Sequence, residues 1–468
     1  MLGGRLILLG LLLPIAFGRW GSYVGVPGTP IYLADVLVMV GLLVWCVDRA
    51  GRHSKGEKDA TTGRRAPTVL KVAAAIFGAV IVIGLSRAGE LSLLAIRDAL
   101  PFVYLALVAV LWSPIQAVGR DTVGRWVRNA AVVHTAWFAP AQLGVLPTIN
   151  VPFAGVPVFT TRGDFDVLIC GLAVVVVAVD GGCRRWVAVL ISALAIAAAL
   201  SSGSRAGLLS AGIVVLVVVL IQRPFNDREA GLRRFGFAAL AVAPITLITL
   251  FVLTDPPEWT VGLRKLIPSD TTTFASGQNT WGARVDAWIL VIQYGMRDAG
   301  SAWLGNGFGS DTIQSSGAIG YLSGDPSVRA AHNFLVTWFA SVGIVGTALV
   351  LVALGLLLLC AARTARAGGI NGIGFGLSIG LMAAGVAGVI LESPFGYMSF
   401  AFAIVVAGLA DETAATVSPM DAPTPGSTQT PSGRKLLQGR SGLASARMPN
   451  WSAFPVRQET ISGDSTQL

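Results

Sequence analysis

Long apolar runs separated by short polar linkers make up most of the chain. The runs are roughly 17–25 residues long, which is the length an α-helix needs to cross about 30 Å of hydrocarbon. The sequence lacks the alternation of apolar and polar residues typical of a membrane β-strand, so the pattern favours a helical bundle over a β-barrel. We expect about twelve spans on this length criterion. They lie near residues 6–20, 30–47, 69–86, 99–113, 129–147, 166–180, 186–201, 206–222, 235–253, 336–361, 370–391 and 397–410.

Composition points to the same fold class. Of the 468 residues, 54% are hydrophobic and 13% are charged, and the mean hydropathy is +0.70. These values exclude an ordinary soluble globular chain. The four cysteines, Cys46, Cys170, Cys183 and Cys360, form no CxxC pair, and we expect them to pack as small hydrophobic residues. The sequence therefore predicts an all-α polytopic membrane protein.

The positive charges are concentrated in alternate linkers. The net charge is +9, but its distribution is typical of a membrane orientation signal, and we expect no nucleic-acid partner. The positive-inside rule makes the basic linkers cytoplasmic. Both termini then lie inside, and residues 254–335 form the one long outward-facing loop. The basic linkers contain Arg49, Arg52, Lys55, Lys58, Arg64, Arg65, Arg120, Arg125, Arg184, Arg185, Arg223, Arg228, Arg233, Arg234, Arg363 and Arg366.

The spans and charges divide the chain into four regions. Residues 1–253 form an N-terminal transmembrane bundle, 254–335 the large extracytoplasmic loop, and 336–412 the C-terminal spans. Residues 413–468 are rich in Pro, Ser, Thr and Gly, which predicts a disordered cytoplasmic tail. The first apolar stretch resembles a signal peptide that ends near residue 18, but the even number of spans favours an uncleaved segment.

Several arginines remain on the outer side, where the orientation rule does not place them. Ionisable residues at membrane boundaries are candidates for a functional site. Arg205 lies in SSGSRAGLLS, a small-residue break between two apolar spans. Its guanidinium either grips a phosphate with its planar fork or snorkels to water at a short hairpin. The outer-side set is Arg19, Arg87, Arg97, Arg162, Arg205, Arg264, Arg284, Arg297 and Arg329.

The outer loop contains a second arginine candidate. The segment GARVDAWILVIQYGM, 282–296, predicts an amphipathic helix on the outer interface, with Arg284 and Trp288 four residues apart. Arg284 is either a substrate contact or, with Asp286, a solvated surface charge. The glycine-rich AWLGNGFGSDT that follows, 302–312, lacks both GK[ST] and GxGxxG. It therefore predicts no nucleotide site.

His332 and Asn333 stand where the outer loop re-enters the membrane, in AAHNFLVTWFASVGIVG. Asn333 is placed to cap the helix that follows. A neutral imidazole accepts a proton near neutral pH, as a general base must. His332 is therefore the catalytic candidate, and the alternative is a structural histidine at a helix start.

Two further polar residues lie on the outer side. Glu392, in VILESPFGYM, ends the eleventh span and either orients the imidazole, pairs with an arginine or ends a helix. Arg162, in VFTTRGDFDVL, is a candidate for a second phosphate contact. No grouping of His, Asp and Glu has metal-ligand spacing, so we predict a metal-independent protein without a cofactor.

Three features in a fixed order resemble the O-antigen ligase and polymerase superfamily of membrane glycosyltransferases. They are SGSRAG before a span, R-x-x-x-W followed by LGNGFGS in a large outer loop, and HNFLVTWFASVGIVG at the next span. The early GTPIYLADVLVMVGLLVW is also similar to that family, and the likeness covers roughly positions 6–410. The chain departs from the family after Arg162, where it reads RGDFDVL in place of a Pro-Asn pair.

The resemblance implies a C-type glycosyltransferase in the bacterial plasma membrane. Such an enzyme moves a glycan from a polyprenyl diphosphate to an acceptor hydroxyl, on a lipid or a glycan, outside the membrane. By the same resemblance Arg205 and Arg284 hold the diphosphate, His332 acts on the acceptor, and the late acidic residue falls at Glu392. A direct displacement inverts the anomeric carbon.

The nearest alternative is a polymerase that extends lipid-linked repeats, and sequence does not separate it from a ligase. An alternative of another class is a transporter or flippase of lipid-linked glycans. Transporters often show inverted repeats and charges near the bilayer midplane. Here the candidate residues gather at the outer ends of spans, which favours the enzyme.

Overall fold

The described part of the chain is helical. The computed structural model describes residues 2–22, 24, 32–54, 66–142, 144–146, 149–150, 157–179, 183–221, 280–322 and 328–409. These ranges all lie in one compact unit, Met1–Thr416. Within them the one β-type contact is an isolated bridge between Asn150 and Pro157. The prediction of an all-α fold is therefore confirmed for this part of the chain.

Helices coincide with every expected span that the structure describes. The expected span at 235–253 and Arg264 lie outside the described residues. The membrane-type helices are α1 (Leu2–Ser22), α2 (Leu33–Ser54), α3 (Thr68–Ser86), α4 (Leu93–Gln116), α5 (Arg120–Gln142), α6 (Gly163–Val179), α7 (Arg185–Ser201), α8 (Arg205–Ile221), α15 (Phe334–Ala365), α16 (Ile370–Ala387) and α17 (Pro394–Ala407). Between α8 and α15 lie α11 (Thr280–Gly295), α12 (Ala299–Leu304), α13 (Thr312–Ser315) and α14 (Ile319–Leu322), and a 3-10 turn, η4 (Ile390–Glu392), precedes α17.

Four of the described helices are long and apolar enough to cross a membrane by length and composition. They are α1, α3, α4 and α15. The apolar helices α7, α8, α16 and α17 are shorter. A polytopic membrane protein is consistent with this set, whereas the number of about twelve spans stays a prediction.

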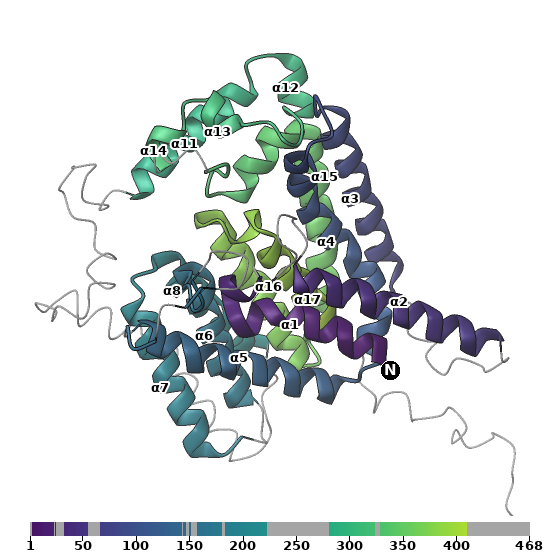
Figure 1. The fold of residues 1–468 in the computed structure, drawn as a ribbon, viewed down its shortest axis with the longest axis vertical. Coiled ribbons are helices and arrows are strands. Elements are labelled where there is room, and N and C mark those ends of the chain that lie inside the picture. The colour runs from purple at the N-terminus through teal and green to yellow at the C-terminus, as the bar shows by residue number, and fades with distance from the viewer. Residues whose placement is uncertain are drawn as a thin grey trace, which may run out of the picture. The chain divides into compact units, whose positions relative to one another are not determined.

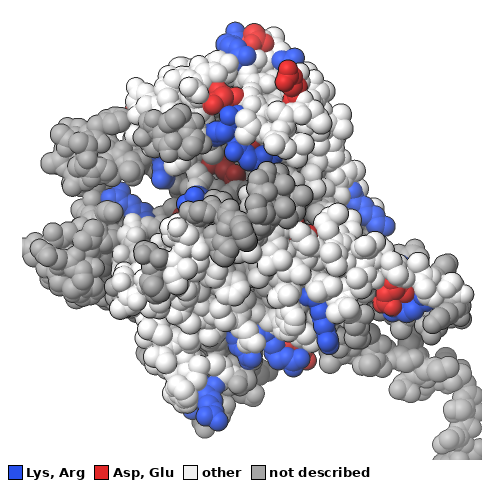
Figure 2. All heavy atoms as spheres, in the orientation of Figure 1, with Lys and Arg blue, Asp and Glu red and all other residues white. Residues whose placement is uncertain are grey.

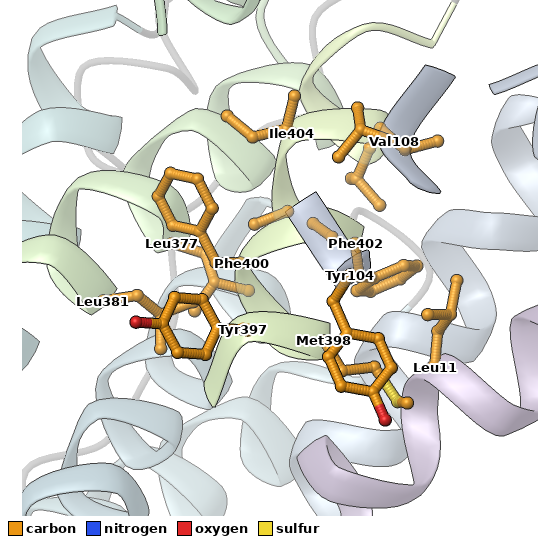
Figure 3. Close-up of a cluster of buried hydrophobic side chains, with 14 of the residues drawn as sticks. Leu11, Tyr104, Val108, Leu377, Leu381, Tyr397, Met398, Phe400, Phe402 and Ile404 are labelled. Carbon is orange, nitrogen blue, oxygen red and sulfur yellow. The ribbon is translucent and has the colours of Figure 1, made fainter. Parts of the chain in front are cut away.

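Helix α17 lies at the centre of the hydrophobic core. It packs against α16, α4 and α1, and its side chains from Phe395 to Ala407 are buried. Figure 3 shows this cluster, in which Tyr397 and Phe400 lie beside Leu377 and Leu381 of α16. A helix that is apolar on every side is stable in a protein core or in lipid, and neighbouring helices surround this one. In Figure 1, α3 runs alongside α15, and α6 contacts α7 and α8.

The glycine-rich turn after α12 is anchored by a break in α15. Gly343 has φ +66 and interrupts the helix, which deprives preceding carbonyls of their usual partners. Asn306 N donates to the Ala340 carbonyl and Gly307 N to the Ser341 carbonyl, each at 2.9 Å. The turn thus continues the hydrogen bonding that the kink interrupts.

Phe308 fixes the same turn against α3 and α4. Its ring is buried and stacks on Phe102 with centroids 5.5 Å apart, and its N–H donates to the Gly84 carbonyl at 3.0 Å. Gly309 N donates to Asp98 Oδ2 at 2.9 Å. These contacts explain the glycine-rich sequence 302–312, which has a structural role here.

Several outer-side arginines also tie segments together. Arg97 pairs with Asp98 at 3.3 Å. Arg329 donates to the Gly309 carbonyl at 3.0 Å and lies 3.4 Å from Asp311. Neither of these two arginines is therefore an obvious substrate contact.

Gly84→Ala tests the seat of Phe308. A Cβ at Gly84 would lie 2.3 Å from the Phe308 ring, and the stacked Phe102 prevents the ring from moving away. We expect a loss of about 1–3 kcal/mol from overpacking, measured as a lower thermal unfolding midpoint in detergent. Gly78→Ala on the same helix is the control, because nothing lies within 4 Å of that position. Equal midpoints for the two variants would show that Phe308 does not fill this space.

Candidate active site

Four residues proposed from sequence converge in one place. Arg162 precedes α6, Arg284 lies in the first half of α11, His332 precedes α15, and Glu392 ends η4. Arg284 and Arg162 act electrostatically on His332, and Glu392 acts on Arg284. Figure 2 shows basic side chains around a hollow in the face viewed, with acidic atoms deep inside it.

His332 occupies a strained backbone conformation. Its φ is +60, and among the described residues only Phe159 shares this feature without being a glycine. Non-glycine residues with positive φ are uncommon and persist where neighbouring contacts hold them. Asn333 follows as the N-cap of α15, its side chain accepting from Leu335 N at 3.0 Å. The predicted cap is thus confirmed.

Glu392 holds the start of α15 in place. Its Oε1 accepts from Asn333 N at 3.0 Å and from the Thr337 hydroxyl at 2.5 Å. Its Oε2 is buried and has no hydrogen-bond partner within the described ranges. Burial raises the pKa of Glu392 to about 7, against the lowering effect of these hydrogen bonds and of Arg162. The carboxyl thus grips the backbone next to His332.

The imidazole of His332 is neutral at physiological pH. Burial, and to a smaller extent the positive charges of Arg284 and Arg162, lower its pKa to about 4. A cation is costly in a partly desolvated place beside other cations. A free nitrogen lone pair is consequently present on His332 at pH 7.

Arg162 is oriented by two neighbours. Its Nε lies 3.2 Å from Asp164 Oδ1, and its guanidinium lies over the Phe395 ring at 5.7 Å from the centroid. Asp164 is also close to the α16–η4 turn, since a Cβ at Gly388 would lie 2.6 Å from its Oδ2. The sequence RGDF, which differs from the family's Pro-Asn pair, thus supplies the Asp164 carboxylate that positions the Arg162 guanidinium.

Arg284 is a partly buried residue of α11. Burial lowers the pKa of its guanidinium, whereas the charges of Asp164 and Glu392 oppose that effect. One turn later on the same helix, Trp288 Nε1 donates to the Ala331 carbonyl at 2.7 Å. The R-x-x-x-W spacing therefore places one residue in the site and uses the other to hold the backbone before His332.

Arg205 lies beside this group at the start of α8. It is half-buried, and no hydrogen bond or ion pair involves its side chain within the described part of the chain. The preceding turn packs on the first residue of α6, because a Cβ at Gly163 would lie 2.9 Å from Ser204 Cβ. The structure therefore brings Arg205 next to the segment that carries Arg162.

Two residues that contribute contacts to the site were not predicted from the sequence. Asp164 was not singled out, although the motif RGDFD offered a carboxylate two residues from Arg162. Thr337 lies four residues after Asn333, and that helical spacing was a usable signal for a shared partner. Within the described ranges, no group of three or more His, Cys, Asp or Glu side chains is placed to hold a metal ion.

A known protein family matches a segment of the chain that includes part of this site. Residues 187–351 match the model of a family described as O-antigen ligase. This part of the chain is similar to that family. The resemblance to the O-antigen ligase and polymerase superfamily is thereby confirmed. Among curated proteins, none matches the chain.

The O-antigen ligase match spans about a third of the chain. It includes Arg205, Arg284 and His332, whereas Arg162 and Glu392 lie outside it. With the apolar helices, it supports a membrane protein of polysaccharide biosynthesis whose activity is of the ligase or polymerase type. Lipid-linked glycans are the substrates that this family implies.

Glu392→Gln tests the buried carboxyl. Because the pKa rises from 4.5 to about 7 on folding, Glu392 stabilises the fold fully below pH 4.5, and this contribution disappears as pH rises through 7. His332 acts in the opposite direction, since its pKa falls from 6.5 to about 4. We therefore expect the wild-type minus variant difference in thermal midpoint to fall between pH 4.5 and 7. A difference independent of pH would contradict the raised pKa.

Proposed function

We propose that the protein transfers a glycan from a polyprenyl diphosphate to an acceptor hydroxyl on the outer side of the plasma membrane. The observation that carries the proposal is the convergence of Arg162 and Arg284 with the neutral imidazole of His332. Cations suit the diphosphate of a donor, and a neutral imidazole suits the hydroxyl of an acceptor. The family match over 187–351 supports the same class of reaction.

The arginines stabilise the leaving group. When the bond between the anomeric carbon and the phosphate oxygen breaks, its electron pair remains on the diphosphate, which gains one negative charge. Guanidinium groups fixed before the reaction stabilise that charge without reorganisation. Arg205 and Arg284 hold the diphosphate in this proposal, and Arg162 supplies a second contact.

His332 removes the acceptor proton. The hydroxyl oxygen attacks the anomeric carbon, the glycosidic bond forms, and the proton moves to the imidazole. A single displacement inverts the configuration at that carbon. The backbone contacts of Glu392 keep His332 at the required place, so Glu392 is a positioning residue.

The membrane arrangement belongs to the same proposal. Residues 254–335 face outward, the flanking regions 1–253 and 336–412 form the transmembrane part, and both termini and the tail 413–468 are cytoplasmic. The site then lies where a loop re-enters the membrane. A donor reaches it from the lipid and an acceptor reaches it from water.

Transfer by purified, reconstituted protein tests the assignments. A labelled glycan on a polyprenyl diphosphate is the donor, and EDTA is present throughout. We expect activity in the wild type, a loss of about 10²–10⁴-fold in His332→Ala, and a loss of about 10²–10³-fold in Arg205→Ala and Arg284→Ala.

Arg297→Ala is the matched control, because Arg297 is exposed on the outer loop and stacks on Tyr294 outside the site. It should retain wild-type activity. Full activity in a folded, inserted His332→Ala protein would overturn the general-base role. Loss of activity in EDTA that added metal restores would contradict metal-independent transfer.

Product length separates the ligase from its nearest alternative. A ligase moves one preassembled block, whereas a polymerase uses a second lipid-linked glycan as acceptor and produces a ladder of repeats. We propose the ligase, and expect a single product band on gel analysis of a reaction supplied with both kinds of acceptor. A ladder would assign the chain to polymerisation. Movement of the donor across the bilayer without transfer would indicate a flippase.

A further inference from the structure

A buried histidine of α5 and a buried aspartate in the first turn of α6 face each other. His134 Nε2 lies 3.4 Å from Asp166 Oδ1, and both side chains are fully buried. The Asp166 carboxylate has no exposed surface. Neither ring nitrogen of His134 nor Asp166 Oδ1 has a hydrogen-bond partner in the described ranges. The close approach of His134 Nε2 and Asp166 Oδ1 is therefore the contact that partly compensates these two atoms.

Such a pair is not needed for packing. An apolar pair of similar volume is often as stable as a buried ionisable pair or more stable, because taking polar groups out of water is costly. Ionisable groups inside a membrane region are rare and usually functional. The pair therefore requires an explanation beyond the core.

A break in α1 creates the space for the pair. Gly18 has φ +60, and a Cβ there would lie 2.8 Å from Asp166 Oδ1 and 3.4 Å from His134 Cε1. Trp137 Nε1 donates to the Ala16 carbonyl at 2.8 Å, and its ring lies 4.8 Å from that of His134. The imidazole is thus fixed between α1 and α5.

The second oxygen of Asp166 leads to the candidate site. Asp166 Oδ2 accepts from the backbone N–H of Arg162, at the first turn of α6. The Arg162 side chain then bonds Asp164 and lies over Phe395. A chain of contacts consequently runs from His134 through Asp166 to the residue that carries the guanidinium.

We propose that His134 and Asp166 are positioning residues that set the Arg162 guanidinium for the donor diphosphate. The imidazole holds one carboxylate oxygen, which aims the other at the Arg162 N–H and fixes where α6 begins. This inference rests on the proposed function of Arg162. It adds two residues outside the segment that matches the family.

The first test is a double-mutant cycle in which the affinity for farnesyl diphosphate is measured on the full chain in nanodiscs. We expect His134→Phe to raise Kd about tenfold when Arg162 is present and to change it by less than about twofold in the Arg162→Ala background. His134→Gln places an amide near the position of Nε2 and should restore most of the binding. Equal losses in both backgrounds would mean a general structural role and would overturn the proposal.

Thr135→Val is the matched control. Thr135 is the buried neighbour of His134 on α5, and its hydroxyl donates within its own helix to the Ala131 carbonyl at 3.1 Å. This variant should bind the probe as the wild type does. If His134→Phe fails to fold, the same cycle is run with Asp166→Asn, which preserves the volume of the side chain.

The second test separates this inference from the proposed function. Hydrogen exchange of the Arg162 N–H should accelerate in His134→Phe and not in Thr135→Val, whatever the protein binds. Unchanged exchange would overturn the positioning role. If the wild type does not bind farnesyl diphosphate, the donor role of Arg162 fails, and the exchange result still decides whether His134 and Asp166 fix the start of α6.

Discussion

The site depends on one carboxyl group. Glu392 joins the turn before α17 to the first residues of α15 through Asn333 N and the Thr337 hydroxyl. These contacts hold the backbone of His332 in a conformation that an isolated chain rarely adopts. Burial keeps a share of Glu392 protonated near neutral pH. The candidate imidazole among arginines is thereby held in place by a group that does not add a full negative charge beside it.

Two of the described helices, α1 and α15, are interrupted by a break in the backbone. Both α1 and α15 contain a glycine with positive φ, Gly18 and Gly343. In each case another segment takes the released carbonyls: Trp137 bonds the one before Gly18, and the glycine-rich turn bonds those before Gly343. In a membrane, irregular backbone is tolerated where protein covers it. The break at Gly18 also makes room for the buried pair of His134 and Asp166.

The sequence alone predicted where the helices lie better than it predicted which residues contact one another. Apolar run lengths located the helices, because hydrocarbon thickness fixes them, whereas the orientation inferred from the charge bias stays a prediction. Partners separated by long stretches of chain left no local pattern. For Glu392 the sequence left three roles open, namely orienting the imidazole, pairing with an arginine or ending a helix, and it did not indicate the hydrogen bond to Asn333 N. His134 lies within the expected span 129–147, and only the fold shows Asp166 opposite it.

The anchorage of the glycine-rich turn has a consequence for biosynthesis. Gly309 and its partner Asp98 are 211 residues apart, and the carbonyls that hold Asn306 and Gly307 belong to α15, which emerges from the ribosome later still. Contacts of such long sequence separation form late. A nascent chain therefore carries its early spans into the membrane without a finished site. The candidate site is complete only after the last helices have been inserted.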